Sequence, residues 1–134
     1  MKKFNSILLI DDDKASNYLA KVIISDIGIT APLEVSTNGK EALDYLEACC
    51  ANGEANFPDL ILLDINMPVM DGFEFLEKSQ YLSCMQTHRP LIIILTSSQY
   101  HSDIERAKSY NINHYVSKPL TEEQLREIFE VSVS

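Results

Sequence analysis

Residues 7–13 have the sequence ILLIDDD, in which four consecutive apolar residues are followed directly by three aspartates. A short run that is apolar at every position is typical of a strand covered on both faces of a sheet, because only a half-exposed strand alternates. The run follows Met1-Lys2-Lys3 and so resembles the start of a secretory signal, but it is too short for one and ends in acids. We therefore predict a buried strand at Ile7–Ile10 with an acidic carboxyl end.

Four more apolar runs follow along the chain, at Leu33–Val35, Leu60–Leu63, Leu91–Leu95 and Tyr115–Val116. The segments between and after these runs carry apolar residues at helical spacing. They predict helices around Ala15–Ile27, Ala42–Cys50, Phe73–Leu76, Ile104–Ala107 and Leu125–Phe129. Strands that alternate with helices indicate a parallel sheet, here with five strands and five helices.

The polarity of the runs predicts the strand order. The first, third and fourth runs are apolar throughout, whereas the second alternates and the fifth is mixed, so the second and fifth strands belong at the edges. With right-handed crossovers, the simplest order is 2-1-3-4-5. The predicted fold class is therefore α/β: one flavodoxin-like, doubly wound domain over residues 1–134, with no output domain.

Three residues are candidates for helix ends. Asn38 can cap the start of the second helix, and Thr121 can form a capping box with Gln124 at the start of the last one. Asn111 can close the preceding helix in a left-handed conformation.

Composition excludes several classes of function. The 134 residues are 46% hydrophobic and 23% charged, and their formal net charge of −9 would repel a nucleic acid backbone and an anionic membrane surface alike. No apolar stretch approaches the ~20 residues of a membrane span, so we expect a cytoplasmic protein that binds neither. Cys49, Cys50 and Cys84 have no metal-type spacing and are expected to be reduced thiols.

Chemistry is expected at the carboxyl ends of the strands, where open parallel sheets bind ligands. The residues there are Asp11 and Asp12, Asp64, Thr96 and Lys118. Three crowded carboxylates call for a cation, and carboxylate oxygens suit Mg²⁺. Mg²⁺, a lysine and a hydroxyl can bind a phosphoryl group, and a carboxylate can accept one as an aspartyl phosphate. Each of these residues alone could be a surface charge or a helix cap. Because they follow four separate strands in the expected order, they favour a shared binding site.

The motifs at these strand ends resemble the receiver domain of two-component response regulators, the CheY-like family, essentially from end to end. They are ILLIDD at 7–12, LLDINMPVMDG at 62–72, LTS at 95–97 and YVSKP at 115–119. The resemblance implies that Asp64 is the phosphoacceptor and that Asp11, Asp12, Asp64 and the backbone carbonyl of Asn66 hold Mg²⁺. It further implies that Thr96 and Lys118 bind phosphoryl oxygens, that Thr96 and Tyr115 form the switch, and that the Lys118-Pro119 bond is cis, although sequence alone leaves the isomer open. Asp13 is not part of the family pattern and is expected to be solvated.

The chain ends at Ser134, soon after the last predicted helix, so we expect a stand-alone signalling protein, and the resemblance implies that it catalyses only its own phosphorylation and dephosphorylation. Its donor would be a histidine kinase or a histidine phosphotransfer protein. A downstream protein or a second copy would bind a face around Ile104, Tyr115 and Leu125. The chain departs from the family at Asn111-Ile112, which replaces a small pair and adds bulk near Tyr115, and at 49–57, where we expect a surface extension.

Two alternatives remain open. The strand followed by Asp11-Asp12-Asp13 also resembles the nucleophile motif of Mg²⁺-dependent phosphohydrolases of the haloacid-dehalogenase type, but Ala15 stands where a threonine or valine is expected and no acidic pair follows Lys118. A hydrolase would depend on Asp11 rather than Asp64. The second alternative is a pseudo-receiver, a binding module that is never phosphorylated.

Overall fold

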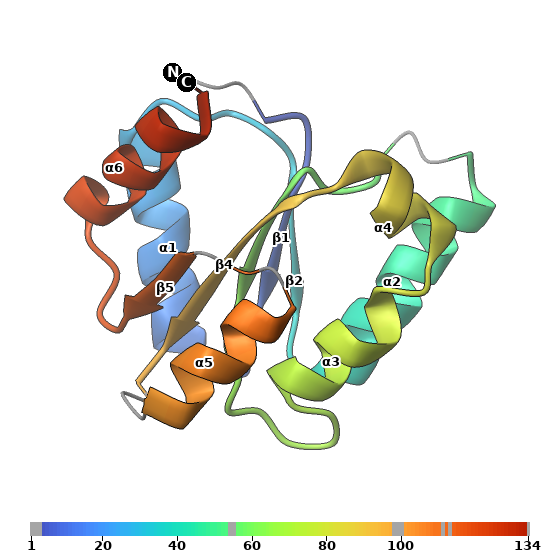
Figure 1. Cartoon of the computed structure of the whole chain (residues 1–134). Helices are drawn as coiled ribbons and strands as arrows, with labels where there is room; N and C mark the ends of the chain where they lie inside the picture. The colour runs from blue at the N-terminus through green and yellow to red at the C-terminus, as the bar shows by residue number, and fades with distance from the viewer. Residues whose placement is uncertain (1–3, 54–55, 98–100, 111, 113, 134) are drawn as a thin grey trace.

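The computed structural model describes residues 4–53, 56–97, 101–110, 112 and 114–133. Within this part of the chain, five parallel strands form one sheet in the order β2-β1-β3-β4-β5 (Figure 1). The strands are β1 (Ile7–Ile10), β2 (Leu33–Ser36), β3 (Leu60–Leu63), β4 (Leu91–Thr96) and β5 (His114–Ser117). The predicted fold class and strand order are confirmed, with β2 and β5 at the edges.

Six helices, rather than the predicted five, lie in the described residues. They are α1 (Lys14–Asp26), α2 (Gly39–Ala51), α3 (Gly72–Ser79), α4 (Ser83–His88), α5 (His101–Ser109) and α6 (Glu122–Val133). The helix that the sequence did not reveal is α4. Its six residues bury Cys84 alone, so it carries no repeating apolar pattern. No helix in the described ranges combines the length and the apolar character that crossing a membrane would require.

The helices cover the sheet on both faces (Figure 1). Ile7 and Leu9 pack in one cluster with α1 and α6, whereas Leu8 and Ile10 pack in another with α2 and α3. Successive side chains of a strand point to opposite faces, so every position of β1 meets a core. This packing is the reason that the first run is apolar throughout.

Side-chain caps fix where the helices begin. The Asn38 side chain accepts a hydrogen bond from the backbone N–H of Glu41 at 2.9 Å, as predicted. Thr121 and Gln124 exchange reciprocal bonds of 3.0 and 3.2 Å, which confirms the capping box. The predicted left-handed closure at Asn111 falls outside the described residues.

The two ends of the domain meet at the amino end of the sheet. Phe4, just before β1, lies against Phe129 of α6 with ring centroids 5.0 Å apart. Both rings are buried. The chain therefore enters and leaves on the side opposite the carboxyl ends of the strands (Figure 1).

Candidate functional site

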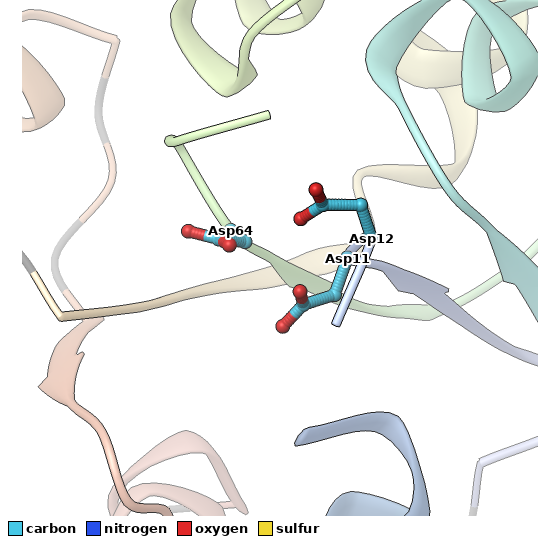
Figure 2. Close-up of side chains that lie close together, drawn as sticks. All are labelled: Asp11, Asp12 and Asp64. Atoms are coloured by element: carbon cyan, nitrogen blue, oxygen red, sulfur yellow. The ribbon is translucent and has the colours of Figure 1, made fainter. Parts of the chain in front are cut away.

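Three carboxylates converge at the carboxyl end of the sheet (Figure 2). Asp11 and Asp12 follow β1, Asp64 follows β3, and one potential ligand oxygen of each lies within 4.8 Å of the others. Asp11 and Asp64 are each only 5% exposed, while Asp12 is open to solvent. The backbone N–H of Asp64 donates to the Ile10 carbonyl at 2.9 Å, so the strand pairing extends into the site and fixes the distance between the acids.

Lys118 lies between two of the acids. Its Nζ is 2.9 Å from Asp11 Oδ2 and 3.3 Å from Asp64 Oδ2. Its backbone N–H donates to the Thr96 carbonyl at 2.9 Å, which continues the pairing of β4 with β5. The Lys118-Pro119 peptide bond is cis.

The electrostatics of the site favour an additional cation. Burial raises the pKa of Asp11 above its usual value and the charge of Asp64 adds to this, while hydrogen bonds from Lys118 and the Asp13 backbone act in the opposite direction. Burial alone would lower the pKa of Lys118, but the bond to Asp11 and the charges of both aspartates outweigh it, so that pKa is raised. One ammonium against three carboxylates leaves an excess of negative charge. Three carboxylate oxygens, one of them from the exposed Asp12, form a ligand set that fits Mg²⁺, because this ion binds few protein oxygens and keeps several waters.

Thr96 is held by a contact that sequence reasoning missed. Its side chain is completely buried, and its Oγ1 accepts a hydrogen bond from Asn66 Nδ2 at 3.1 Å. The backbone N–H of Asn66 also donates to Asp64 Oδ1 at 3.1 Å. Asn66 was predicted only as a backbone ligand, because nothing in the sequence indicates where its amide points.

The loop between β3 and α3 is clamped by close backbone contacts. A Cβ on Gly72 would lie 2.7 Å from both the Asp64 carbonyl oxygen and the Ile65 Cα, and one on Gly39 would lie 2.7 Å from the Met70 carbonyl oxygen. The sequence includes Gly72 in the motif at 62–72 but indicates neither of these close contacts. Within the loop, Val69 is exposed and has a φ of 67°.

Asp13 is exposed, as expected for a solvated acid, but it also caps α1. It accepts bonds from the Ala15 backbone at 3.0 Å and from Ser16 Oγ at 3.1 Å, which lower its pKa, the Ser16 bond having the larger effect. It lies outside the group of three acids that could hold a metal.

Two residues of the expected partner face differ in exposure. Tyr115 is partly buried and packs against the core cluster on the α2 and α3 side of the sheet. Leu125 is 0% exposed and packs in the cluster on the α1 and α6 side. The prediction that Leu125 contributes to a contact surface is wrong, because it belongs to the buried stripe of α6.

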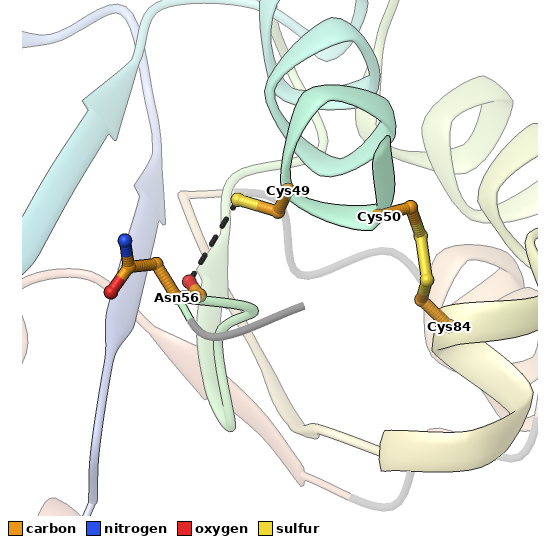
Figure 3. Close-up of a disulfide and its surroundings, with 4 residues drawn as sticks. All are labelled: Cys49, Cys50, Asn56 and Cys84. Carbon is orange, nitrogen blue, oxygen red and sulfur yellow. Dashed lines mark hydrogen bonds between the residues drawn. A yellow bond between two sulfur atoms is a disulfide. The ribbon is translucent and has the colours of Figure 1, made fainter. Parts of the chain in front are cut away.

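The expectation of three reduced thiols is also wrong. Cys50 at the end of α2 forms a disulfide with Cys84 of α4, with Cα atoms 6.1 Å apart, and Cys49 is a buried free thiol (Figure 3). Because the pair is 34 positions apart in sequence and one member lies on the unpredicted α4, spacing gave no sign of it.

Comparison with known proteins agrees with this geometry. The family model described as "Response regulator receiver domain" matches residues 7–130. The probable methanogenesis regulatory protein FilR2 of Methanothrix harundinacea is 35% identical over 92% of this chain and 78% of its own length. The hybrid signal transduction histidine kinase K of Dictyostelium discoideum is 31% identical over 95% of this chain, which spans only 10% of that protein.

Solved structures show the same architecture. A two component response regulator from Cytophaga hutchinsonii has a TM-score of 0.85 and 30% identity, with 98% of both chains covered. The Mn(2+)-bound form of response regulator Rcp1 has a TM-score of 0.75 and 27% identity, covering 95% of this chain and 88% of that one. The match over residues 7–130 and the shared fold show that the chain belongs to the response regulator receiver domain family.

Proposed function

We propose that this receiver domain accepts a phosphoryl group on Asp64 in a Mg²⁺-dependent reaction and thereby switches a protein-binding face. The observation that carries the proposal is the convergence of Asp11, Asp12 and Asp64 within 4.8 Å of one another, with Lys118 Nζ 3.3 Å from Asp64 Oδ2. Carboxylates from the ends of neighbouring strands, together with one lysine, provide a nucleophile, a metal site and a cation for phosphoryl oxygens.

The residues of the site would have distinct roles. Asp11, Asp12, Asp64 and the backbone carbonyl of Asn66 would hold Mg²⁺, which when bound neutralises charge on the phosphoryl oxygens. An Asp64 carboxylate oxygen forms the new bond to phosphorus, and the bond from phosphorus to the donor breaks. Lys118 binds a phosphoryl oxygen in place of its present contact with Asp64.

Thr96 would complete the binding of the phosphoryl group. Its hydroxyl now accepts a bond from Asn66, and movement toward the phosphoryl group requires that this bond be released. We expect Tyr115 to change its packing as Thr96 moves. The residues that would transmit the change lie on β5 and its neighbours.

The donor in this proposal is a histidine kinase or a histidine phosphotransfer protein in the cytoplasm. The family generally acts in signalling, and the Dictyostelium relative is itself named a histidine kinase. The output is binding of a downstream protein or a second copy at the surface of α5, β5 and α6, around Ile104 and Tyr115. We propose that the domain catalyses its own phosphorylation and dephosphorylation.

The test is incubation with acetyl phosphate and Mg²⁺, followed by intact mass spectrometry. The wild type should gain one phosphoryl group and Asp64→Asn should gain none. Asp13→Asn is the matched control, because it removes a carboxylate outside the cluster while asparagine still caps α1. It should be phosphorylated like the wild type.

The remaining outcomes separate the alternatives. Phosphate release that depends on Asp11 but survives Asp64→Asn would contradict the proposal and favour a phosphohydrolase. No mass gain together with no Mg²⁺ binding by calorimetry would favour a pseudo-receiver.

A further inference from the structure

The Cys50–Cys84 disulfide joins α2 to the short helix α4 at the end of the molecule opposite the acid cluster (Figure 1). We propose that this disulfide is redox-sensitive: a dithiol reductant reduces it reversibly in the folded protein, and its reduction releases α4 from α2. The inference goes beyond the proposed function and does not depend on phosphorylation.

Helix α4 is attached to the rest of the domain by this covalent bond and by several weaker contacts. Cys84 is its one buried residue, and Leu82, the N-cap residue before Ser83, makes no side-chain cap bond. Its other contacts include the packing of Cys84 and Met85 against the core, a hydrogen bond from Gln86 Nε2 to the Gln80 carbonyl at 3.2 Å, and the stacking of His88 on Phe57, with ring centroids 5.0 Å apart. A helix of six residues is too short to be stable without tertiary contacts, and the disulfide through Cys84 is the covalent one among them.

The disulfide can be reached from one side. Cys50 is partly exposed at the last turn of α2, whereas Cys84 is only 4% exposed. Attack is therefore expected at Cys50 Sγ, with Cys84 as the leaving thiolate. Cys49 points away from the bond, and its Sγ donates to the Asn56 carbonyl at 3.8 Å (Figure 3). The second thiol that completes the exchange must then come from the reductant.

The exchange balances as a two-electron reduction. A reductant thiolate forms a bond to Cys50 Sγ while the bond between Cys50 and Cys84 breaks. The second thiol of the reductant then attacks the reductant sulfur in the mixed disulfide and releases Cys50, which takes up the proton that this thiol loses. The reductant ends as a disulfide, and both cysteines end as thiols after Cys84 takes up a proton from water.

Release of α4 would change a pocket of about 580 Å³. The pocket is lined by Met85 and Gln86 of α4 and by the adjacent Arg89 on one side, and by residues that include Leu76 and Tyr110 on the other. Reduction frees one wall of this pocket and leaves the other wall in place. The thiol state would therefore determine how well the pocket is formed.

The first experiment counts thiols in the folded protein. Wild type purified in air is titrated with mixtures of reduced and oxidised dithiothreitol, labelled with N-ethylmaleimide after denaturation, and weighed intact. We expect one label at the oxidised end, three at the reduced end, and a return to one when oxidised dithiothreitol is restored. Three labels in air, or one label at millimolar reductant under native conditions, would overturn the proposal.

The second experiment measures amide hydrogen exchange in α4. Reduction should accelerate exchange at Gln86 and Arg89 by about tenfold or more, while amides in the middle of α2 stay protected. Cys50→Ser should show the fast exchange without reductant and no further response, and Cys49→Ser should behave as wild type. Unchanged exchange on reduction, or loss of protection throughout the molecule, would overturn the proposal. The disulfide would then be a structural cross-link that does not control the attachment of α4.

Discussion

At the scale of single residues, Val69 adopts a backbone conformation that is unfavourable for a β-branched side chain. Its φ of 67° lies in the left-handed region, and its side chain is 77% exposed, so it gains little packing in return. We predict that Val69→Gly raises the free energy of unfolding by about 1 kcal/mol, because relief of this strain exceeds the added entropy of the unfolded chain. Urea denaturation measures the change.

Val69→Ala is the control for that substitution. Alanine removes the same exposed methyl groups but keeps a Cβ, so it should recover less stability than glycine does. Equal gains from the two variants would indicate that the methyl groups, and not the backbone angle, are responsible.

At the scale of elements, the start of α3 packs closely against the backbone that follows β3. Gly72→Ala would place a Cβ 2.7 Å from the Asp64 carbonyl oxygen, and since the obstructing atoms are backbone, the loop beside Asp64 must shift. We predict a loss of about 1 to 3 kcal/mol in stability and slower phosphorylation by acetyl phosphate. Denaturation and time-resolved mass spectrometry measure the two effects.

Gly53→Ala separates the two effects. Gly53 has a φ of +89° and no atom within 4 Å of the added Cβ, so alanine there costs stability without displacing a neighbour. It should be phosphorylated at the wild-type rate. A Gly72→Ala protein that also reacts at the wild-type rate would show that the loop tolerates the shift.

The elements also show how far sequence could predict this molecule. The run at β1 predicted a doubly covered strand because four apolar residues in succession, bounded by acids, fit a strand buried on both faces. The strand ends then placed Asp11, Asp64 and Lys118 together. The helix α4 was missed because six residues with one buried side chain leave no periodic signal. Its disulfide was missed for the same reason, since pairing depends on where α4 packs.

Side-chain directions were the other failure. The apolar spacing around Leu125 indicates the buried stripe of a helix, so the expectation that Leu125 lies on a contact surface did not follow from that pattern, and no pattern indicated that the Asn66 amide reaches Thr96. Directions of this kind depend on tertiary packing and on individual rotamers. The positions of the candidate site were therefore predictable, whereas its internal contacts were not.

At the scale of the whole molecule, the acid cluster and the proposed partner face are linked through β4 and β5. Thr96 ends β4 opposite Ser117 of β5, and its hydroxyl must leave Asn66 to reach a phosphoryl group on Asp64. We predict that phosphorylation changes amide exchange in α5 and β5, while the far edge strand β2 is unchanged. Hydrogen exchange in acetyl phosphate and Mg²⁺, with Asp64→Asn as the unphosphorylated control, measures this.

Identical exchange in the phosphorylated and free proteins would mean that the α5, β5 and α6 surface does not respond. Output would then have to be made by the phosphorylated site itself. A change of equal size in β2 would indicate a general change in stability instead of a directed one.

The contact between Phe4 and Phe129 gives the domain the geometry of an insertable module. With entry and exit side by side at one pole and the acids at the other, a domain of this build can be spliced into a longer polypeptide without its junctions shielding the reactive aspartate. In the Dictyostelium kinase, the region that matches this chain is a tenth of the protein. The same geometry makes tandem fusion of this chain to a reporter at either end compatible with access to Asp64.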